Sequence, residues 1–292
     1  MAAPCLQERA AKMFEITSLA HLADQFDAFF IDQFGVLIDG KLAYDGAADA
    51  LKILRASGTQ NLLLSNSGKR SEPNEIRLTK LGFDRSSYQM VLTSGEVAYR
   101  ELSARLGRSI QKGALVFVIS RDLDHSCVDG LEIIVTSNIS EASLIIIAGS
   151  EGDRFSLETY EKLLKDPAKA NVPCWCTNPD THMLTQEGTT FGAGQIARLY
   201  AQLGGTVQWF GKPHPAIYHM ALEVLSTAKP QPKKVLCIGD SIEHDIAGGH
   251  RAGLKTALVR TGIYKDTSLD ELKSMAQNHK AAPDYIIPVF AF

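Results

Sequence analysis

The chain has 292 residues, of which 45% are hydrophobic and 22% are charged, a composition typical of a folded globular protein and not of a disordered or fibrous one. Its 30 basic and 33 acidic residues give a formal net charge of −3, which excludes the concentrated positive charge that nucleic acids and anionic membranes attract. At about 100–200 residues per domain, the length allows two domains.

Residues 1–9 contain no basic segment ahead of a long apolar one, and no stretch approaches about 18 apolar residues, so we expect neither an export signal nor a membrane span. The cysteines are odd in number and scattered, which argues against a disulfide framework and favours the cytosol: Cys5, Cys127, Cys174, Cys176 and Cys237. The Cys174-Trp175-Cys176 segment lacks the two-residue gap usual at zinc sites. We predict that it packs in the core, with metal or redox use as the alternative.

The first predicted strand is the apolar run 29–31, which ends at Asp32 and is followed by Gly35. In open α/β sheets, ligands bind beyond the carboxyl ends of the strands, so Asp32 is a candidate site residue. The alternative is that Asp32 only forms a turn or caps a helix. A few residues later, Asp39 and Gly40 lie between short apolar patches and predict a small hairpin, with Asp39 as a turn residue.

Strands and helices alternate through the rest of the chain, which is typical of an α/β fold with parallel sheets. Helical spacing is found over 47–54 and 75–81, and residues 91–95 mark a boundary. A second α/β unit follows, with helices over 96–106 and 156–165 and strands over 114–119, 131–135, 144–148 and 172–176. The first unit resumes with a helix over 195–203, and the preceding Gly-Ala-Gly, 192–194, is interpreted as a hinge.

Three further strands also end in polar residues. Ser65 and Asn66 follow one apolar run, Lys212 follows another within Gly-Lys-Pro-His-Pro, and Asp240 and Asp245 follow a third within Gly-Asp-Ser-Ile-Glu-His-Asp. Together these residues supply a hydroxyl, an amide, a cation and two carboxylates. Such an oxygen-rich set suits phosphate and magnesium, because Mg²⁺ commonly binds through one or two carboxylates together with substrate phosphate oxygens.

The ordered set resembles the four motifs of the haloacid dehalogenase (HAD) superfamily of phosphohydrolases. Asp32 matches the nucleophile of motif I, Ser65 matches motif II, Lys212 matches motif III, and Asp240 with Asp245 matches motif IV. The order of the motifs and the apolar run before each one agree with the family as well.

The resemblance narrows to the class IIA, or NagD-like, branch. The segment Thr177-Asn178-Pro179-Asp180-Thr181-His182, the Gly-Lys-Pro-His-Pro run and the closing part of the chain are similar to that branch, and the likeness extends from about residue 26 to about residue 288. It implies a Rossmann-like core with a parallel sheet, formed by residues 1–95 and 195–292. It also implies an inserted α/β cap domain, residues 96–194, which would select the substrate.

The resemblance further implies how a phosphomonoester would be bound and cleaved. Asp32 would attack phosphorus and form an aspartyl-phosphate, which splits one difficult displacement into two easier steps. Lys212 would act in catalysis and hold the phosphoryl oxygens together with Ser65 and Asn66. His182, in the cap segment, would contact the substrate.

Magnesium is the implied cofactor. The resemblance assigns it to the carboxylates of Asp32 and Asp240 and to the backbone carbonyl of Phe34, with Asp245 as an outer or stabilising acid. Two acids as close in sequence as Asp240 and Asp245 need positive charge between them if they lie side by side.

One position departs from the family pattern. HAD phosphatases carry a second Asp two residues after the nucleophile, where it protonates the leaving oxygen, and here that residue is Phe34. Phenylalanine cannot transfer a proton, and general acid–base catalysis is worth about 10²–10⁴-fold in rate. We therefore expect slow turnover of alkyl phosphates and faster turnover of esters with activated leaving groups.

The sequence thus predicts a cytosolic, magnesium-dependent phosphatase that acts on a small phosphorylated metabolite, a sugar phosphate or a nucleotide-like compound, with a homodimer as a possible assembly. One alternative is a weakly catalytic protein that binds and senses such a metabolite, and Phe34 is the residue that favours it. Another is a non-phosphatase HAD hydrolase that cleaves carbon–halogen bonds. The acidic motif around Asp240 argues against this second alternative, because halide release needs no magnesium.

Overall fold

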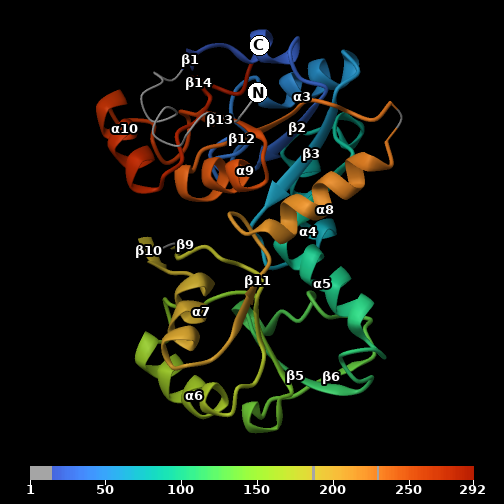
Figure 1. Ribbon diagram of the computed structural model, residues 1–292, viewed down its shortest axis with the longest axis vertical. Helices are drawn as coiled ribbons and strands as arrows, with labels where there is room; N and C mark the ends of the chain where they lie inside the picture. Colours follow the sequence, from blue (N-terminus) through green and yellow to red (C-terminus); the bar gives the residue numbers. More distant parts are fainter. Residues whose placement is uncertain (1–14, 186–187, 229) are drawn as a thin grey trace, which may run out of the picture. The chain divides into compact units, whose positions relative to one another are not determined.

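The computed structural model describes residues 15–185, 188–228 and 230–292, and the chain divides into two compact units (Figure 1). The first unit consists of residues up to 65, 74–92 and 218–292, and the second of residues 66–73 and 93–217. Both units are α/β, as predicted. The prediction that residues 1–9 carry no export signal, and Cys5, lie outside the described residues.

A seven-stranded sheet forms the centre of the first unit, in the order β1-β14-β13-β12-β2-β3-β4. Its strands are β1 (Glu15–Ile16), β2 (Ala28–Asp32), β3 (Gln60–Ser65), β4 (Met90–Thr93), β12 (Val235–Gly239), β13 (Lys255–Val259) and β14 (Tyr285–Ile287). The register pairs Asp32 with Leu64 and Ile31 with Ile238, all in parallel. Because these strands are parallel, the residues that follow β2, β3 and β12 emerge at the same edge of the sheet.

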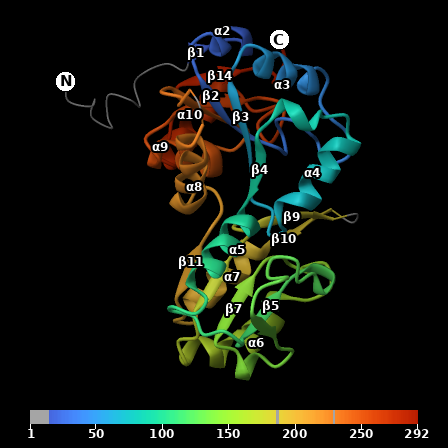
Figure 2. The same cartoon turned by 90° about the vertical axis from the view of Figure 1, so that its right-hand side faces the viewer.

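Helices cover both faces of this sheet, which explains why its strands are continuous apolar runs. They are α2 (Leu19–Ala23), α3 (Ala47–Ala56), α4 (Ser71–Lys80), α8 (Pro215–Ser226), α9 (Ala247–Arg251) and α10 (Leu269–Asn278), with short turns η1 (Arg85–Ser87) and η4 (Ile242–Ile246). Figure 2 shows α3 and α4 on one side of the sheet and α8 and α9 on the other. The core on the α3 side includes Leu51, Phe29 and Ile238, all fully or almost fully buried.

The predicted helices and the predicted turn are confirmed in this unit. The helix predicted over 47–54 is α3, and the one predicted over 75–81 is α4, which begins earlier, at Ser71. Asp39 is a turn residue as expected, because its Oδ1 accepts hydrogen bonds of 2.8 Å from the backbone N–H groups of both Lys41 and Leu42.

The second unit contains a five-stranded parallel sheet in the order β11-β8-β7-β5-β6 and a separate hairpin of β9 and β10. The strands are β5 (Ala114–Ile119), β6 (Ile133–Val135), β7 (Leu144–Ile147), β8 (Cys174–Cys176), β9 (His182–Thr185), β10 (Gly188–Phe191) and β11 (Val207–Trp209). The helices are α5 (Ser94–Arg105), α6 (Leu157–Lys169) and α7 (Ala193–Gln202), with turns η2 (Arg121–Leu123) and η3 (Ile139–Glu141). Each predicted element of this unit is present within a few residues of its expected bounds.

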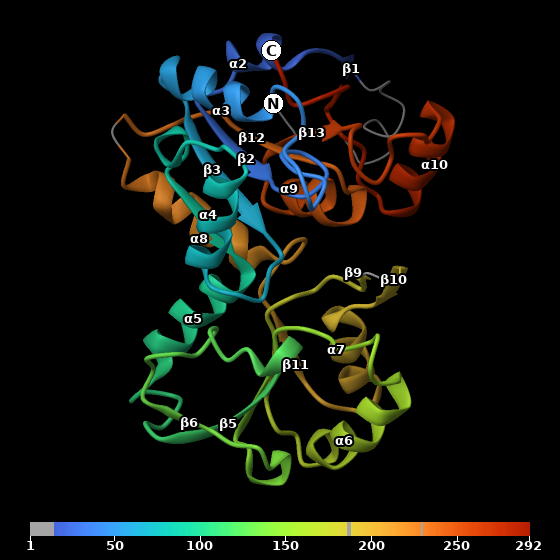
Figure 3. The ribbon, with the colours of Figure 1, turned by 180° about the vertical axis from the view of Figure 1, so that it is seen from behind.

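Helices α6 and α7 lie next to each other and pack on one face of this sheet (Figure 3). Cys174 and Cys176 point into the core beneath them and are buried. Burial raises the pKa of Cys176 to about 12, so its side chain stays a neutral thiol at ordinary pH. These observations support the packing role predicted for the Cys174-Trp175-Cys176 segment.

The second unit extends beyond the boundary expected at residues 194 and 195. Strand β11 pairs in parallel with β8, and α7 packs in the core of the second unit, so residues 195–217 belong here and not to the first sheet. The interpretation of residues 192–194 as a hinge is wrong. Gly192 is the N-cap of α7, and a Cβ there or at Gly194 would collide with the backbone of residues 179 and 180.

Within the described ranges, no helix combines the length and the apolar character needed to cross a membrane.

Candidate active site

Three carboxylates meet at the carboxyl edge of the seven-stranded sheet. Asp32 ends β2, Asp240 follows β12 directly, and Asp245 lies in the turn η4 after it. One carboxylate oxygen from each lies within 4.8 Å of the other two. The parallel register of β2 and β12 brings these residues together, so the structure confirms that the predicted acids share one place in the fold.

Asp240 sits between two glycines that leave no room for side chains. A Cβ built on Gly35 or on Gly262 would lie 1.9 Å from Asp240 Oδ2, far inside van der Waals contact. Gly35 also has a φ of 77°, a conformation that other residues adopt only with strain. The backbone N–H of Ile263 donates to Asp240 Oδ2 at 3.0 Å, which fixes the carboxylate in this narrow space.

The loop that carries Gly262 is attached to the one that carries Gly35. Thr261 Oγ1 donates to the Gly35 carbonyl at 2.6 Å, and the Tyr44 hydroxyl donates to the Thr261 carbonyl at 3.0 Å. The two glycines are thereby held on either side of Asp240, and the position of its carboxylate is set by backbone and not by flexible side chains.

Asp245 is directed back toward β12 by an unusually wide turn. In η4, a π-helical turn, the N–H groups of Asp245 and Ile246 both donate to the Ser241 carbonyl, at 2.9 and 3.1 Å. The Ser241 N–H donates to Asp245 Oδ2 at 3.1 Å, and a Cβ on Gly239 would overlap the Asp245 carboxyl group. Beneath the turn, the buried Tyr218 hydroxyl donates to the Asp245 carbonyl at 3.5 Å.

This donor set fits a hard divalent cation. Three carboxylates within 4.8 Å of one another repel each other, and a cation among them removes that repulsion. The ligands are oxygens, which magnesium and calcium prefer. The carbonyl oxygen of Phe34, the fourth predicted ligand, accepts no hydrogen bond from the described residues and is free to coordinate a metal.

Phe34 presents an aromatic ring where the family pattern places an acid. Its side chain is 42% exposed, and the Arg77 guanidinium carbon lies 4.7 Å from the ring centroid. On the chain just beyond, a Cβ on Gly40 would touch the ring edge at 3.5 Å. The ring therefore has a defined place at the edge of the sheet, and it offers no group that can transfer a proton.

Ser65 ends β3, buried, at the edge where Asp32 also emerges. Asn66, the next residue, has a role that the sequence did not reveal. Its Oδ1 accepts from the Lys212 backbone N–H at 2.7 Å, and its Nδ2 donates to the Lys212 carbonyl at 3.1 Å and to Asp180 Oδ1 at 2.7 Å. Both N–H donors of the amide are used, so a phosphate contact by Asn66 would have to come from its backbone.

The two hydrogen bonds between the Asn66 side chain and the Lys212 backbone, here called the clamp, hold Lys212 in the second unit. A Cβ on Gly211 would collide with Asn66 Oδ1 and with the ring of Pro179, so the segment before Lys212 passes close to the 177–182 segment. His182, predicted to contact substrate, is exposed at the start of β9, where its Nδ1 lies 3.0 Å from Thr181 Oγ1. The structure therefore connects two of the sequence motifs, Gly-Lys-Pro-His-Pro and 177–182, through Asn66.

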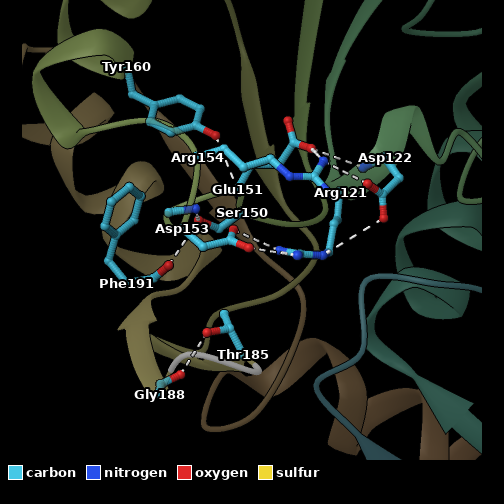
Figure 4. Close-up of polar contacts among 11 residues, drawn as sticks. Arg121, Asp122, Ser150, Glu151, Asp153, Arg154, Tyr160, Thr185, Gly188 and Phe191 are labelled. Atoms are coloured by element: carbon cyan, nitrogen blue, oxygen red, sulfur yellow. Dashed lines mark hydrogen bonds and ion pairs between the residues drawn. The ribbon is translucent and has the colours of Figure 1, made fainter.

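The carboxyl edge of the second sheet also collects charged residues, but these pair with one another (Figure 4). Arg121, after β5, donates to both carboxylate oxygens of Asp153, after β7, at 2.9 and 2.8 Å. This contact lowers the pKa of Asp153 to about 2. Arg154 donates through Nη1 to Asp122 Oδ1 at 2.7 Å and to Glu151 Oε1 at 2.5 Å, and so links the same two loops.

Sequence reasoning missed three contributors to the site: the pair Gly35 and Gly262, the clamp by Asn66, and Arg77. Gly35 was noticed only as a turn. Gly262 follows no strand motif, and its importance depends on a loop more than 200 residues away closing on Asp240. Arg77 belongs to none of the sequence motifs. Only the structure shows that it reaches the residues that follow Asp32.

Comparison with known proteins agrees with this site. A family profile described as "Haloacid dehalogenase-like hydrolase" matches residues 29–134, and one described as "HAD-hyrolase-like" matches residues 209–291. Chronophin from Rattus norvegicus is 27% identical over 292 residues, which cover 94% of this chain and 89% of that protein. The acid sugar phosphatase of Staphylococcus aureus (strain USA300) is 25% identical over 266 residues, which cover 89% and 94%.

Among solved structures, a hydrolase of the haloacid dehalogenase-like family from Brucella suis 1330 superposes with a TM-score of 0.79 at 28% identity, covering 93% of this chain and 98% of that one. The chain therefore belongs to the haloacid dehalogenase superfamily, in its class IIA (NagD-like) branch, and is a hydrolase.

Proposed function

We propose that the protein is a magnesium-dependent phosphatase that acts on a small phosphorylated metabolite through an aspartyl-phosphate on Asp32. The observation that carries the proposal is the meeting of Asp32, Asp240 and Asp245 within 4.8 Å at the carboxyl edge of the sheet. The name of one relative, the acid sugar phosphatase of Staphylococcus aureus, and the class IIA assignment support a phosphomonoester as substrate.

In this mechanism, a carboxylate oxygen of Asp32 attacks phosphorus and the leaving oxygen departs on the opposite side, and water then cleaves the acyl phosphate. Lys212, with Ser65, is assigned to the negative charge on the phosphoryl oxygens, an assignment that rests on their motifs. Asp32, Asp240 and the Phe34 carbonyl would hold Mg²⁺, with Asp245 beside them. When bound, the ion would neutralise charge on the phosphoryl group.

Phe34 sets the expected limit on the first step. Without an acid at this position, the leaving oxygen must depart with its negative charge, which costs about 10²–10⁴-fold in rate for a poor leaving group. Aryl and acyl phosphates have leaving groups that carry this charge well, so they are expected to be hydrolysed faster than alkyl phosphates. The second step is affected too, because no carboxylate at position 34 is available to deprotonate the attacking water.

Phe34 also favours a second candidate function, a protein that binds a phosphometabolite and reports its level without hydrolysing it. Its exposed ring takes the place of the proton-transferring group while the carboxylate cluster is complete. Magnesium-dependent binding without phosphate release would favour this function. An aspartyl-phosphate trapped on Asp32 would exclude it.

The test is a phosphate-release screen over alkyl, aryl and acyl phosphates, with and without Mg²⁺, on the wild type, Asp32→Asn and Phe34→Asp. We expect release that requires Mg²⁺, is abolished in Asp32→Asn, and rises for alkyl phosphates in Phe34→Asp by about 10²-fold or more. Equal rates on alkyl and aryl esters in the wild type would show that another group transfers the proton. Full activity in Asp32→Asn would contradict the nucleophile assignment.

A location in the cytosol and a homodimeric assembly complete the proposal. The scattered cysteines favour a reducing compartment. Fractionation of the native host cell and light scattering of the purified protein test these two points.

A further inference from the structure

Arg77 is a half-buried cation whose hydrogen-bond partners are all neutral. Its Nη2 donates to Gln33 Oε1 at 3.0 Å and to Asn74 Oδ1 at 3.1 Å, and its guanidinium carbon lies 4.7 Å from the centroid of the Phe34 ring. No carboxylate among the described residues forms an ion pair with it. Burial lowers the pKa of Arg77, which is the direction expected for a desolvated cation that lacks a counter-ion.

Arg85, in the same unit, is an arginine whose positive charge is paired with an acid. Its guanidinium carbon lies 4.9 Å from the ring centroid of Tyr88, much as Arg77 lies over Phe34. Unlike Arg77, Arg85 forms an ion pair of 3.2 Å with Glu75. The stacking on a ring is therefore common to both, and the missing acid distinguishes Arg77.

Two buried nitrogen atoms at Arg77 also lack hydrogen-bond partners. Gln33 is fully buried, and its Nε2 has no hydrogen-bond acceptor, nor does the buried Nε of Arg77. The remaining nitrogen, Nη1, forms no hydrogen bond with the described residues and is not among the buried atoms. Arg77 thus keeps one outward N–H group and a full positive charge available for an acceptor from outside the chain.

The position of this cation relates it to the reacting phosphate. Gln33 and Phe34, two of its three contacts, directly follow Asp32, and two residues span at most about 7 Å. In the proposed mechanism the phosphorus of the substrate lies at Asp32. A leaving group a few bonds long has the length to span this separation from the phosphorus.

We propose that Arg77 is a specificity-determining residue that binds a second anionic group, such as a carboxylate, on the leaving-group part of the substrate, with the Phe34 ring as the surface against which that part lies. The inference rests on the proposed phosphatase function and names its substrate class: phosphomonoesters that carry a further negative charge. An arginine without an ion pair on the segment that follows Asp32 also has a physical reason in this role, since its charge attracts the anionic end of a substrate.

The test compares two esters that differ only in charge, 4-(carboxymethyl)phenyl phosphate and its amide, 4-(carbamoylmethyl)phenyl phosphate, together with the corresponding 3-substituted pair. The measured quantity is the ratio of kcat/KM for the acid to that for the amide. In the wild type we expect a ratio well above 1 for at least one pair. Because a hydrogen bond to a charged group is worth about 10–100-fold in affinity, Arg77→Gln is expected to lower that ratio by about 10-fold or more.

Arg85→Gln is the matched control, since it removes an arginine that stacks on a ring but has its own acid, and the ratio should not change. Arg77→Lys keeps the charge and should retain part of the preference. A ratio that is the same in Arg77→Gln as in the wild type overturns the inference, and leaves the proposed phosphatase function intact if both esters are hydrolysed.

A binding measurement covers the case in which Arg77→Gln does not fold or no ester is hydrolysed. Calorimetry on the wild-type protein with Mg²⁺ compares the binding of phosphonoacetate with that of phosphonoacetamide, in which a neutral carboxamide replaces the carboxylate. Tighter binding of phosphonoacetate supports the inference independently of turnover, and equal binding overturns it. Absence of hydrolysis alone would count against the proposed phosphatase function and not against the anion preference.

Discussion

The two sheets of this protein treat the charges at their carboxyl edges in opposite ways. On the seven-stranded sheet, Asp32, Asp240 and Asp245 bring three charges of the same sign within 4.8 Å of one another. On the five-stranded sheet, Arg121 and Arg154 pair with the acids of the neighbouring loop (Figure 4). Both edges are places where α/β proteins bind ligands, so position in the fold does not separate them.

The difference lies in the signs of the charges that each edge brings together. Opposite charges such as Arg121 and Asp153 bind each other directly and join two loops. Carboxylates held close together repel one another, and a divalent cation is a ligand that would offset this repulsion. An edge that gathers like charges against rigid glycines is therefore the better candidate for an active site.

The largest effect is expected from Gly262→Ala, because the new Cβ would lie 1.9 Å from Asp240 Oδ2 and must displace that carboxylate. A misplacement of about 1 Å at a reacting centre costs about 10²-fold in rate, so we expect at least this loss in Mg²⁺-dependent kcat/KM. The measurement is phosphate release against Mg²⁺ concentration. Gly253→Ala adds a Cβ that meets nothing but is strained by its φ of 76°, so it is the control for destabilisation without a collision at Asp240. Unchanged Mg²⁺ dependence in Gly262→Ala would mean that Asp240 is not a ligand.

A smaller loss is expected for Asn66→Ala, which removes the clamp on the Lys212 backbone. We expect kcat to fall by about 10-fold or more, with KM for the aryl phosphate changed less, because positioning of a charged group matters most in the transition state. Asn66→Asp keeps the acceptor for the Lys212 N–H but places a carboxylate against Asp180, so it should not recover kcat. An unchanged kcat in Asn66→Ala would show that the clamp does not position Lys212 for catalysis.

The free energy of unfolding, measured in EDTA and in Mg²⁺, tests the comparison of like and paired charges. Asp240→Asn removes one of the proposed ligands and should abolish the stabilisation that Mg²⁺ gives the wild type over EDTA. Asp284→Asn should instead destabilise the protein equally in Mg²⁺ and in EDTA. Burial alone would raise the pKa of Asp284, but contacts with His250, Lys255 and the Thr256 N–H lower it to about 2.

The lowered pKa of Asp284 determines how its contribution to stability changes with pH. Its contribution is fully present above the unfolded-state pKa of about 4 and is lost as the pH falls toward 2, so Asp284→Asn should cost about 2 kcal/mol at pH 7 and almost nothing near pH 2. Urea unfolding of both variants from pH 7 to pH 3 measures these differences. Undiminished stabilisation of Asp240→Asn by Mg²⁺ would show that Asp240 is not a ligand.

The smallest effect is expected for Asp153→Asn on the second sheet. Exposed ion pairs contribute little, so the melting temperature should fall by no more than about 3 °C, with no change in the response to Mg²⁺. Because the Arg121 guanidinium lowers the pKa of Asp153 to about 2, this small difference should persist down to about pH 4. A large loss of activity would assign the paired loops a direct part in catalysis.

The sequence predicted the elements and the acids well, because both depend on local patterns. Buried strands show as apolar runs, and Asp32, Asp240 and Asp245 each follow one. Parallel pairing of β2 with β12 then brings them together without further information. The class IIA assignment rests on the same segments and agrees with the comparisons.

What the sequence did not predict depends on contacts between distant segments. Residues 195–217 were assigned to the wrong unit because an apolar run does not say which sheet it joins, and β11 pairs with β8. The hydrogen bonds between Asn66 and Lys212 could not be predicted, because 146 residues separate them in the sequence. That Arg77 forms no ion pair with the described residues is likewise a property of its surroundings in space.

The wide turn η4 has a consequence for how this protein can change during evolution. Deleting one residue between Ser241 and Ile246 would replace the π-type i→i+5 hydrogen bond between them with an α-type i→i+4 bond. Because each helical residue turns the chain by about 100°, the deletion would also rotate Asp245 away from its place. Relatives that conserve the chemistry should therefore keep the number of residues in this turn together with the acid at the position of Asp245.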